Sequence, residues 1–204
     1  MRCPHLRVLF PTVVALLAAT ACGPSKWEGT YTPSQPAAAV PALAATEEVR
    51  LREVSWERLA AALDELDAER AASDAPFEEW PAAEQDAAKS RLLRALQVTA
   101  DPAQVQLLGR SVFRTTYSTN PNDGKLASFA RTIGANTVVW SSNYLGKTQV
   151  VRDEPVTEWR TGSTYSRHGR RRSDTFTENS TIWVPVVVEA DEHAFIAYYL
   201  RESR

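Results

Sequence analysis

Apolar side chains at helical spacing, followed by a β-branched run, form the clearest local pattern in the chain. The helical positions are Leu126, Phe129, Ala130 and Ile133. Asp123 precedes them with a carboxylate that can accept from free backbone N–H groups, and Gly134 follows, able to adopt a left-handed conformation. The chain then continues into Val138-Val139-Trp140, whose residue types favour strands. The pattern predicts a short helix packed on a sheet.

Residues 47–98 predict two further helices. Apolar residues at helical spacing follow Ser55, an expected N-cap, and continue to about Ala72. A second helix is expected after Pro81, which suits a first helical turn. Its apolar side holds Ala88, Leu92, Leu93 and Leu96. We expect the two helices to form a hairpin that covers the sheet, with a short strand over residues 49–52 before them.

The second half of the chain predicts strands and a long polar segment. Strands are expected over residues 105–113, 181–188 and 194–200, the last after a turn at Asp191-Glu192. Gly109 indicates a bulge or a close backbone approach. Residues 147–180 are rich in Thr, Ser and Arg and too long for an ordinary loop. They predict an arm, either a protruding β-hairpin or a partly disordered segment.

These elements predict an α+β fold. We expect an N-terminal helical hairpin packed with a small, mainly antiparallel sheet, which carries one helix and a long polar arm. A chain of this length can bury a core without staples, since a 150-residue domain buries about 70% of its unfolded surface.

Residues 1–22 have the layout of an export signal. Arg2 and Arg7 precede an apolar run over residues 8–17, and small residues lead to Cys22. The stretch Ala19-Thr20-Ala21-Cys22 resembles the lipobox of bacterial lipoproteins, which implies that Cys22 is acylated and begins the mature chain. The alternative is an ordinary secretory peptide that is cut near Ala21.

The expected organisation has three parts: a signal peptide (1–21), an acylated cysteine with a Pro/Ala-rich tether (22–46) and a single α+β domain (47–204). Within the domain, residues 47–98 are the helical part, residues 103–204 the sheet part and residues 147–180 the arm. Cys3 leaves with the signal, so no intramolecular disulfide is expected. Gly23 rather than aspartate follows the cysteine. By resemblance to lipoproteins of enteric type, this favours the periplasmic face of the outer membrane.

Charge is distributed unevenly along the chain. The mature chain carries 21 basic and 25 acidic side chains, a net charge of −4, which argues against a nucleic-acid partner. The helical residues 46–98 carry a net charge of −6. The arm holds a cluster of arginines that suits phosphates or carboxylates on lipopolysaccharide, peptidoglycan or an envelope protein. This predicted anion or partner site contains Arg160, Arg167, Arg170, Arg171 and Arg172. The alternative is a solvated loop that contacts the protein's own acidic helices.

The sequence lacks the common catalytic motifs. It contains no Gly-x-Ser-x-Gly elbow, no Gly-rich phosphate loop and no paired-histidine zinc motif. Asp191, Glu192 and His193 are adjacent, and we interpret them as a turn rather than a cation site. We therefore predict no catalytic residues, no metal and no cofactor, and leave enzyme activity open with a non-catalytic role favoured.

The C-terminal half resembles a set of uncharacterised bacterial envelope lipoproteins. The resemblance begins at about Leu107. It rests on LLGRS, on LASFARTIGANTVVWSSNYLGKT, on the Thr/Tyr/Ser/Arg-rich interval and on WVPVVV and FIAYYLRE. It implies an envelope location and no particular activity. Three functions are considered: a non-catalytic, membrane-tethered lipoprotein with a binding arm, a hydrolase or carbohydrate-active enzyme with two carboxylates across a cleft, and an oligomerising structural module.

Overall fold

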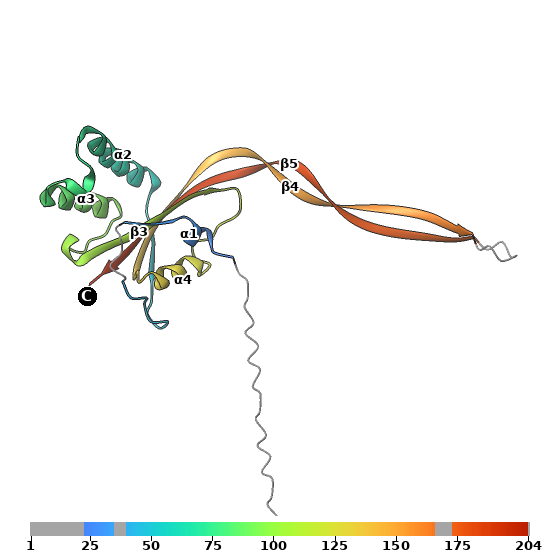
Figure 1. The fold of residues 1–204 in the computed structure, drawn as a ribbon, viewed down its shortest axis with the longest axis horizontal. Coiled ribbons are helices and arrows are strands. Elements are labelled where there is room, and N and C mark those ends of the chain that lie inside the picture. The colour runs from blue at the N-terminus through green and yellow to red at the C-terminus, as the bar shows by residue number, and fades with distance from the viewer. Residues whose placement is uncertain (1–22, 35–39, 166–172, 204) are drawn as a thin grey trace, which may run out of the picture.

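The computed structural model describes residues 23–34, 40–165 and 173–203. Its centre is a five-stranded mixed sheet in the order β1-β3-β5-β4-β2 (Figure 1). The strands are β1 (Tyr31–Pro33), β2 (Arg50–Glu53), β3 (Val105–Thr115), β4 (Thr137–Tyr165) and β5 (Ser173–Glu202). The helices of the described residues are α1 (Lys26–Gly29), α2 (Trp56–Ala72), α3 (Ala82–Ala95) and α4 (Lys125–Thr132), with 3-10 turns at Phe77–Glu79 and Pro102–Gln104.

The predicted fold class is wrong. Strands make up 44% of the structure and helices 30%, so the protein is dominated by its sheet rather than by a helical hairpin packed on a small sheet. The sheet is also mixed, because β2 pairs with β4 in parallel. The error arose because β4 and β5 are 29 and 30 residues long, whereas the sequence pattern was divided into shorter strands separated by a polar segment and a turn.

Near the C-terminus the sheet is covered on both faces. In Figure 1, α2 and α3 lie on one side of the sheet and α1 and α4 on the other. Alternate residues of β5 point to opposite faces. Phe195 and Tyr199 join the core on the α1/α4 side, and Ile196 and Leu200 join the core on the α2/α3 side. This double burial explains why residues 194–200 form an uninterrupted apolar run.

The individual helices agree with the local sequence signals. The Ser55 side chain accepts from the backbone N–H of Arg58 at the start of α2, and Pro81 precedes α3. The Asp123 carboxylate accepts from the N–H of Lys125, although Gly124 is the N-cap of α4. Gly134 has φ +81°, the left-handed conformation expected after the helix. Local capping was therefore predictable even though the fold class was not.

The predicted tether is folded over its described residues. Trp27 of α1 is 3% exposed and packs edge-on against Phe113, with the ring centroids 4.7 Å apart. β1 pairs antiparallel with β3, and Val40 and Leu43 pack against the same core. The few large apolar residues of this segment suffice because the sheet already offers a hydrophobic surface for them.

Gly109 lies both at a bulge and at a close backbone approach, the two roles that the sequence suggested as alternatives. The ladder between β3 and β5 shifts register between Leu107 and Gly109. A Cβ at this glycine would also lie 2.5 Å from the carbonyl oxygen of Thr32 and 2.5 Å from the ring of Tyr31. The glycine therefore lets β1 lie directly against β3.

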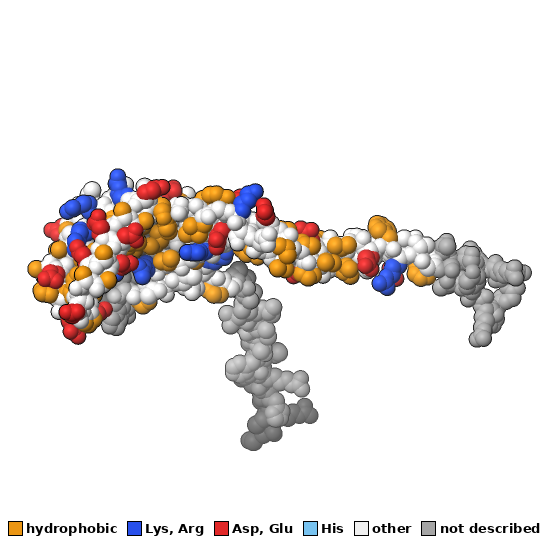
Figure 2. All heavy atoms as spheres, turned by 90° about the horizontal axis from the view of Figure 1, so that it is seen from above, with side chains coloured by type: hydrophobic (Ala, Val, Ile, Leu, Met, Phe, Trp, Pro, Cys, Tyr) orange, Lys and Arg blue, Asp and Glu red, His pale blue; other side chains and the backbone are white. Residues whose placement is uncertain are grey.

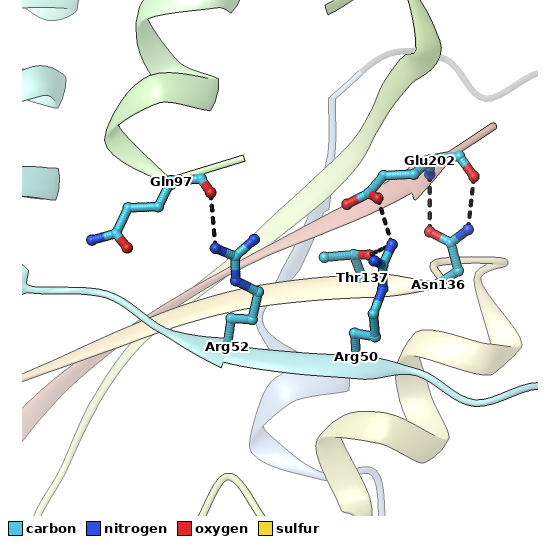
Figure 3. Close-up of polar contacts among 6 residues, drawn as sticks. All are labelled: Arg50, Arg52, Gln97, Asn136, Thr137 and Glu202. Carbon is cyan, nitrogen blue, oxygen red and sulfur yellow. Dashed lines mark hydrogen bonds and ion pairs between the residues drawn. The ribbon is translucent and has the colours of Figure 1, made fainter. Parts of the chain in front are cut away.

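Side-chain contacts fix the end of the sheet where β5 terminates (Figure 3). The Asn136 amide donates to the carbonyl oxygen of Glu202 at 2.8 Å and accepts from its N–H at 2.9 Å. The Arg50 guanidinium pairs with the Glu202 carboxylate and donates to Thr137 Oγ1. Arg52 donates to the carbonyl oxygen of Gln97 at 2.9 Å, which connects β2 to the chain after α3. The last strand is thereby anchored at its free end.

At the other end, β4 and β5 extend past the rest of the sheet as a two-stranded ribbon (Figure 1). Their pairing continues without interruption from Gly146↔Glu192 to Tyr165↔Ser173. Two expectations are therefore wrong: residues 181–188 pair within this ribbon rather than in the covered sheet, and no turn occurs at Asp191-Glu192. Side chains on both faces of a two-stranded ribbon are exposed to water. The polar residues of this segment are therefore compatible with continuous strands, although the sequence pattern suggested a break.

Candidate functional site: the hairpin arm and the cleft at its base

The hairpin arm consists of residues 147–165 and 173–190. It begins beyond an irregularity between Tyr144 and Gly146, where Gly146 has φ +114°. β3 ends at Thr115, opposite His193, so no third described strand pairs with the arm. At about 3.3 Å per residue, the 19 arm residues of β4 span on the order of 60 Å. The protruding β-hairpin is thus the form of the predicted arm that the structure supports.

Large apolar side chains are exposed on both faces of the hairpin arm. Val151 pairs with Val187, and Trp183 with Pro155, so these partners share one face. Val156 and Ile182 pair on the opposite face. The most exposed of the set, at 65% to 69%, are Val151, Trp159, Trp183 and Val187. Figure 2 shows hydrophobic side chains along the length of the arm.

Each edge of the hairpin arm carries a proline near its middle. Pro155 lies on β4 and Pro185 on β5, in the pairs Pro155↔Trp183 and Asp153↔Pro185. The two pairs are two steps apart in the ladder, so both are of the same kind, and antiparallel pairs alternate between hydrogen-bonded and non-hydrogen-bonded. Proline has no N–H, so it fits where the backbone nitrogen points away from the partner strand. Each edge therefore lacks one outward donor, which disfavours pairing with a further strand.

The predicted arginine site is only partly within the described residues. Arg160 lies on the shaft of the arm with its side chain 78% exposed, and its guanidinium is 3.5 Å from Glu158 of the same strand. Cys22 and the remaining arginines of the site lie outside the described residues: Arg167, Arg170, Arg171 and Arg172. Figure 1 shows the arm directed away from α2 and α3, so Arg160 is remote from the acidic helices.

A cleft of about 600 Å³ lies where the hairpin arm meets the covered sheet. The buried rings of Trp140 and Phe195 contribute to its lining, together with residues of the segment 116–121 that follows β3. Ser142, His193, Asp191, Glu189 and Arg152 add polar groups. The volume is typical of small-molecule sites, but the lining is more polar than in most of them.

Tyr117, in this cleft, lies near two cations. Lys26 Nζ is 4.8 Å from the centroid of the Tyr117 ring, and Arg152 Cζ is 5.5 Å from it. Arg152 also donates to the carbonyl oxygen of Thr116 at 3.3 Å, and Lys26 donates to Thr115 Oγ1. Burial lowers the pKa of the Lys26 ammonium from its usual value. Tyr117 is nevertheless 65% exposed, so this cluster is accessible from solvent.

The carboxylates in the cleft lie side by side on one strand. Glu189 and Asp191 are two residues apart on β5 and project to the same side. Each has a partner, since Lys147 Nζ is 3.9 Å from Glu189 and the Tyr144 hydroxyl donates to Asp191 at 3.2 Å. Desolvation, then the bond to Asp191, raises the pKa of Tyr144. Among the described lining residues, no carboxylate lies on the opposite wall, as acid/base hydrolysis of a glycoside requires.

Sequence reasoning missed the cleft, although single signals were present. Asp191, Glu192 and His193 were interpreted as a turn, but they belong to a continuous strand, and Glu192 points to the other side. Within the described residues, no group of three or more His, Cys, Asp or Glu side chains is placed to hold a metal ion. Arg152 and Tyr117 are 35 positions apart, so only the fold brings them together.

Comparison with protein families, with curated proteins and with solved structures finds no match to this chain. The resemblance to envelope lipoproteins therefore stays a prediction from the sequence. Of the helices that the structure describes, none is long and apolar enough to cross a bilayer.

Proposed function

We propose that this protein is a non-catalytic envelope lipoprotein, tethered through a lipid on Cys22, whose hairpin arm binds a partner in the cell envelope. The observation that carries the proposal is the exposure of apolar side chains along an arm on which no other described strand packs. The export signal and the lipobox supply the location.

The composition of the arm supports partner binding. An isolated two-stranded hairpin is at best marginally stable in water, and this one continues for many residue pairs beyond the rest of the sheet. Trp159 and Trp183 are exposed on it, and tryptophan is enriched among residues that dominate binding energy at protein interfaces. A partner that covers these rings would supply the packing that the arm lacks.

The prolines indicate how the partner is engaged. Pro155 and Pro185 each remove an outward donor, so adding a strand to either edge loses a hydrogen bond at mid-length. The faces carry no such obstacle and hold the exposed apolar side chains. The proposed contact is therefore with the faces of the arm rather than through extension of the sheet.

The arginines of the arm indicate that the proposed partner carries anionic groups. Arg160, Arg167, Arg170, Arg171 and Arg172 lie within thirteen consecutive residues of the sequence. Guanidinium groups match phosphate and carboxylate oxygens in geometry. Self-contact with the acidic helices is disfavoured for Arg160 because the arm is directed away from α2 and α3. Lipopolysaccharide, peptidoglycan and an acidic envelope protein remain the proposed classes of partner.

The test is co-sedimentation of the mature chain with purified sacculi and, separately, with lipopolysaccharide vesicles over a range of salt concentrations. One variant, the face variant, changes the more exposed face of the arm, on which both tryptophans lie (Trp159→Ser with Trp183→Ser). Another changes the four arginines 167, 170, 171 and 172 to serine. The matched control, Trp80→Ser, changes a tryptophan outside the arm. Light scattering of the same proteins detects self-association.

Binding to either polymer that is lost in the face variant and kept in the control supports the proposal. Association between copies that is lost in the face variant, without binding to either polymer, supports the oligomerising module instead. Loss in the arginine variant together with weakening by salt supports the anionic component. If all four proteins behave alike in sedimentation and scattering, the arm is not a binding device for these partners and the proposal is wrong.

A further inference from the structure

The start of the mature chain is attached firmly to the body of the protein. Trp27 is buried and packs edge-on against the stacked rings of Phe113 and Phe195, and Ser25 caps the helix that contains it. Only residues 23–25 separate Cys22 from α1. Four peptide units span at most about 14 Å, so a lipid on Cys22 would hold α1 close to the bilayer surface. This step rests on the proposed lipidation of Cys22.

The short connection selects the side of the body that meets the bilayer. α1 and α4 lie on one face of the sheet, and α2 and α3 lie on the other (Figure 1). A flexible tether of 24 residues would let the body of the protein turn freely relative to the bilayer. Here Trp27 is buried in the body only five positions after Cys22, so the connection is too short for free rotation. The α1/α4 side is therefore the membrane side, and the helices α2 and α3 face away from it.

Close to α1, the structure presents a group of side chains suited to lipid head groups. Tyr117 is exposed and lies near Lys26 and Arg152, as described above. Tyrosine is favoured at membrane interfaces because its ring is apolar and its hydroxyl is polar. Lysine has three donors and arginine five, and the structure uses only one bond from each here, so donors remain for phosphate oxygens.

The nearby acidic residues that the structure describes form no ion pair with this group. Glu189 and Asp191 line the same cleft, but Lys147 and the Tyr144 hydroxyl are their respective partners. No ion pair joins Lys26 or Arg152 to a carboxylate in the described residues. Two cations thus flank one exposed aromatic ring beside the proposed lipid attachment point.

We propose that Lys26, Tyr117 and Arg152 form a docking surface for the phosphate head groups of bilayer phospholipids. The lipid on Cys22 supplies the attachment, and this surface fixes the orientation of the body on the membrane. Because Arg152 belongs to the hairpin arm, the base of the arm is held at the bilayer surface.

The first experiment measures which side of the protein faces the lipid. The full acylated chain is reconstituted into phospholipid vesicles that contain a lipid with a quencher on its head group. Cys22 is occupied by its lipid, so Ser118→Cys or Asp74→Cys supplies the only free thiol for a fluorophore. Both positions are exposed; Ser118 follows Tyr117, and Asp74 lies between α2 and α3. We expect at least a severalfold stronger quenching at position 118 than at position 74. Equal quenching at the two positions would overturn the proposal.

The second experiment tests the cations in vesicles with and without phosphatidylglycerol. Lys26→Gln with Arg152→Gln is expected to reduce quenching at position 118, most strongly with the anionic lipid. The matched control Arg58→Gln removes an exposed charge from α2 and is expected to leave quenching unchanged. Cation-dependent quenching that appears only when lipopolysaccharide is added would assign the surface to a different source of phosphate and overturn the phospholipid assignment.

Flotation with the vesicles tests the lipid anchor on Cys22 separately from the docking surface. If the chain does not float with vesicles, or if Cys22→Ser floats equally well, the proposed lipid anchor is wrong. If the native chain floats and Cys22→Ser does not, the anchor is sound, and the quenching contrast alone decides whether the docking surface is correct.

Discussion

Two apolar runs of the same strand have opposite surroundings. Residues 194–200 of β5 are buried, with exposures of 7% or less, whereas Ile182, Trp183 and Val187 are 42% to 66% exposed. The runs look alike in sequence, and both pair with β4. The difference is that β3 and the helices cover the first run, whereas β3 ends at Thr115, opposite His193. An apolar run therefore indicates a strand, but the neighbouring elements decide whether it is a core or an exposed surface.

The largest expected effect separates the body from the arm. Trp27→Ala removes a buried ring that contacts Phe113 and Phe195, and should lower the free energy of unfolding by about 3–5 kcal/mol. The matched change in the arm, Trp183→Ala, should alter it by less than about 0.5 kcal/mol because the ring is largely exposed. Urea denaturation followed by circular dichroism measures both. Similar losses would contradict the distinction between a self-supporting body and an exposed arm.

A smaller effect is expected at the contact of β1 with β3. In Gly109→Ala the new Cβ would overlap the Thr32 carbonyl and the Tyr31 ring, which should destabilise the protein by about 1–3 kcal/mol. Gly29→Ala is the control, since no atom lies within 4 Å of its added Cβ. Thermal unfolding distinguishes the variants. A neutral Gly109→Ala would mean that the N-terminal segment does not pack on the sheet as described.

The buried tyrosines of the body predict a loss of stability at high pH. Burial raises the pKa of both Tyr198 and Tyr199 above the usual value of 10.0, because the phenolate is poorly solvated there. As the pH rises, the phenols of the unfolded chain therefore lose their protons at a lower pH than those of the folded chain. Stability from this source is therefore complete below about pH 10 and declines as the pH rises above it.

Tyr199→Phe should reduce this alkaline decline, since it removes one of the raised phenols. Its own cost near neutral pH is the hydrogen bond to Ser111 at 2.9 Å, worth about 1 kcal/mol. Phe129→Leu, which changes a buried ring that carries no titratable group, should leave the decline unchanged. Urea midpoints in a pH series provide the comparison. An identical decline in all three proteins would show that other groups cause it.

The smallest effect on stability, and the most specific to the arm, is expected from its prolines. Pro155→Thr with Pro185→Thr restores an outward N–H on each edge and should change the free energy of unfolding by less than about 0.5 kcal/mol. It should, however, raise the concentration-dependent light scattering, because the edges can then pair with other strands. The control Val151→Thr with Val187→Thr alters a face and leaves the edges intact. Unchanged scattering in the proline variant would remove the proposed role of the edges.

Local sequence signals predicted the helices well and the arrangement of strands poorly. Ser55, Pro81, Asp123 and Gly134 act on backbone groups within a few residues, so their effects are visible in a short window. The ends of β4 and β5 depend on pairing between residues far apart in the chain, such as Gly146 with Glu192, 46 positions apart, and Thr137 with Leu200, 63 positions apart. A short stretch of sequence never contains both partners of such a pair. The boundary between the covered sheet and the arm could therefore not be predicted from the sequence.

The candidate site shows the same limit. The arginine cluster of the arm is continuous in sequence and was recognised directly. The cleft and the Lys26, Tyr117 and Arg152 group combine α1, the segment after β3 and the arm, so only the folded chain reveals them. The arm's edge prolines were visible in the sequence, but their meaning depended on the register that places them two steps apart in one ladder.

By itself, the sequence indicated the positions of the main helices and the presence of a long polar arm, and it is the basis for predicting an export signal with lipid attachment at Cys22. These depend on composition and on contacts between neighbouring residues. The tertiary structure alone decided that the segment after Cys22 is folded, that β4 and β5 extend beyond the sheet, and that one apolar run is buried and the other exposed. The physical reason is that burial is a property of what packs against a residue, and those partners are distant in the chain.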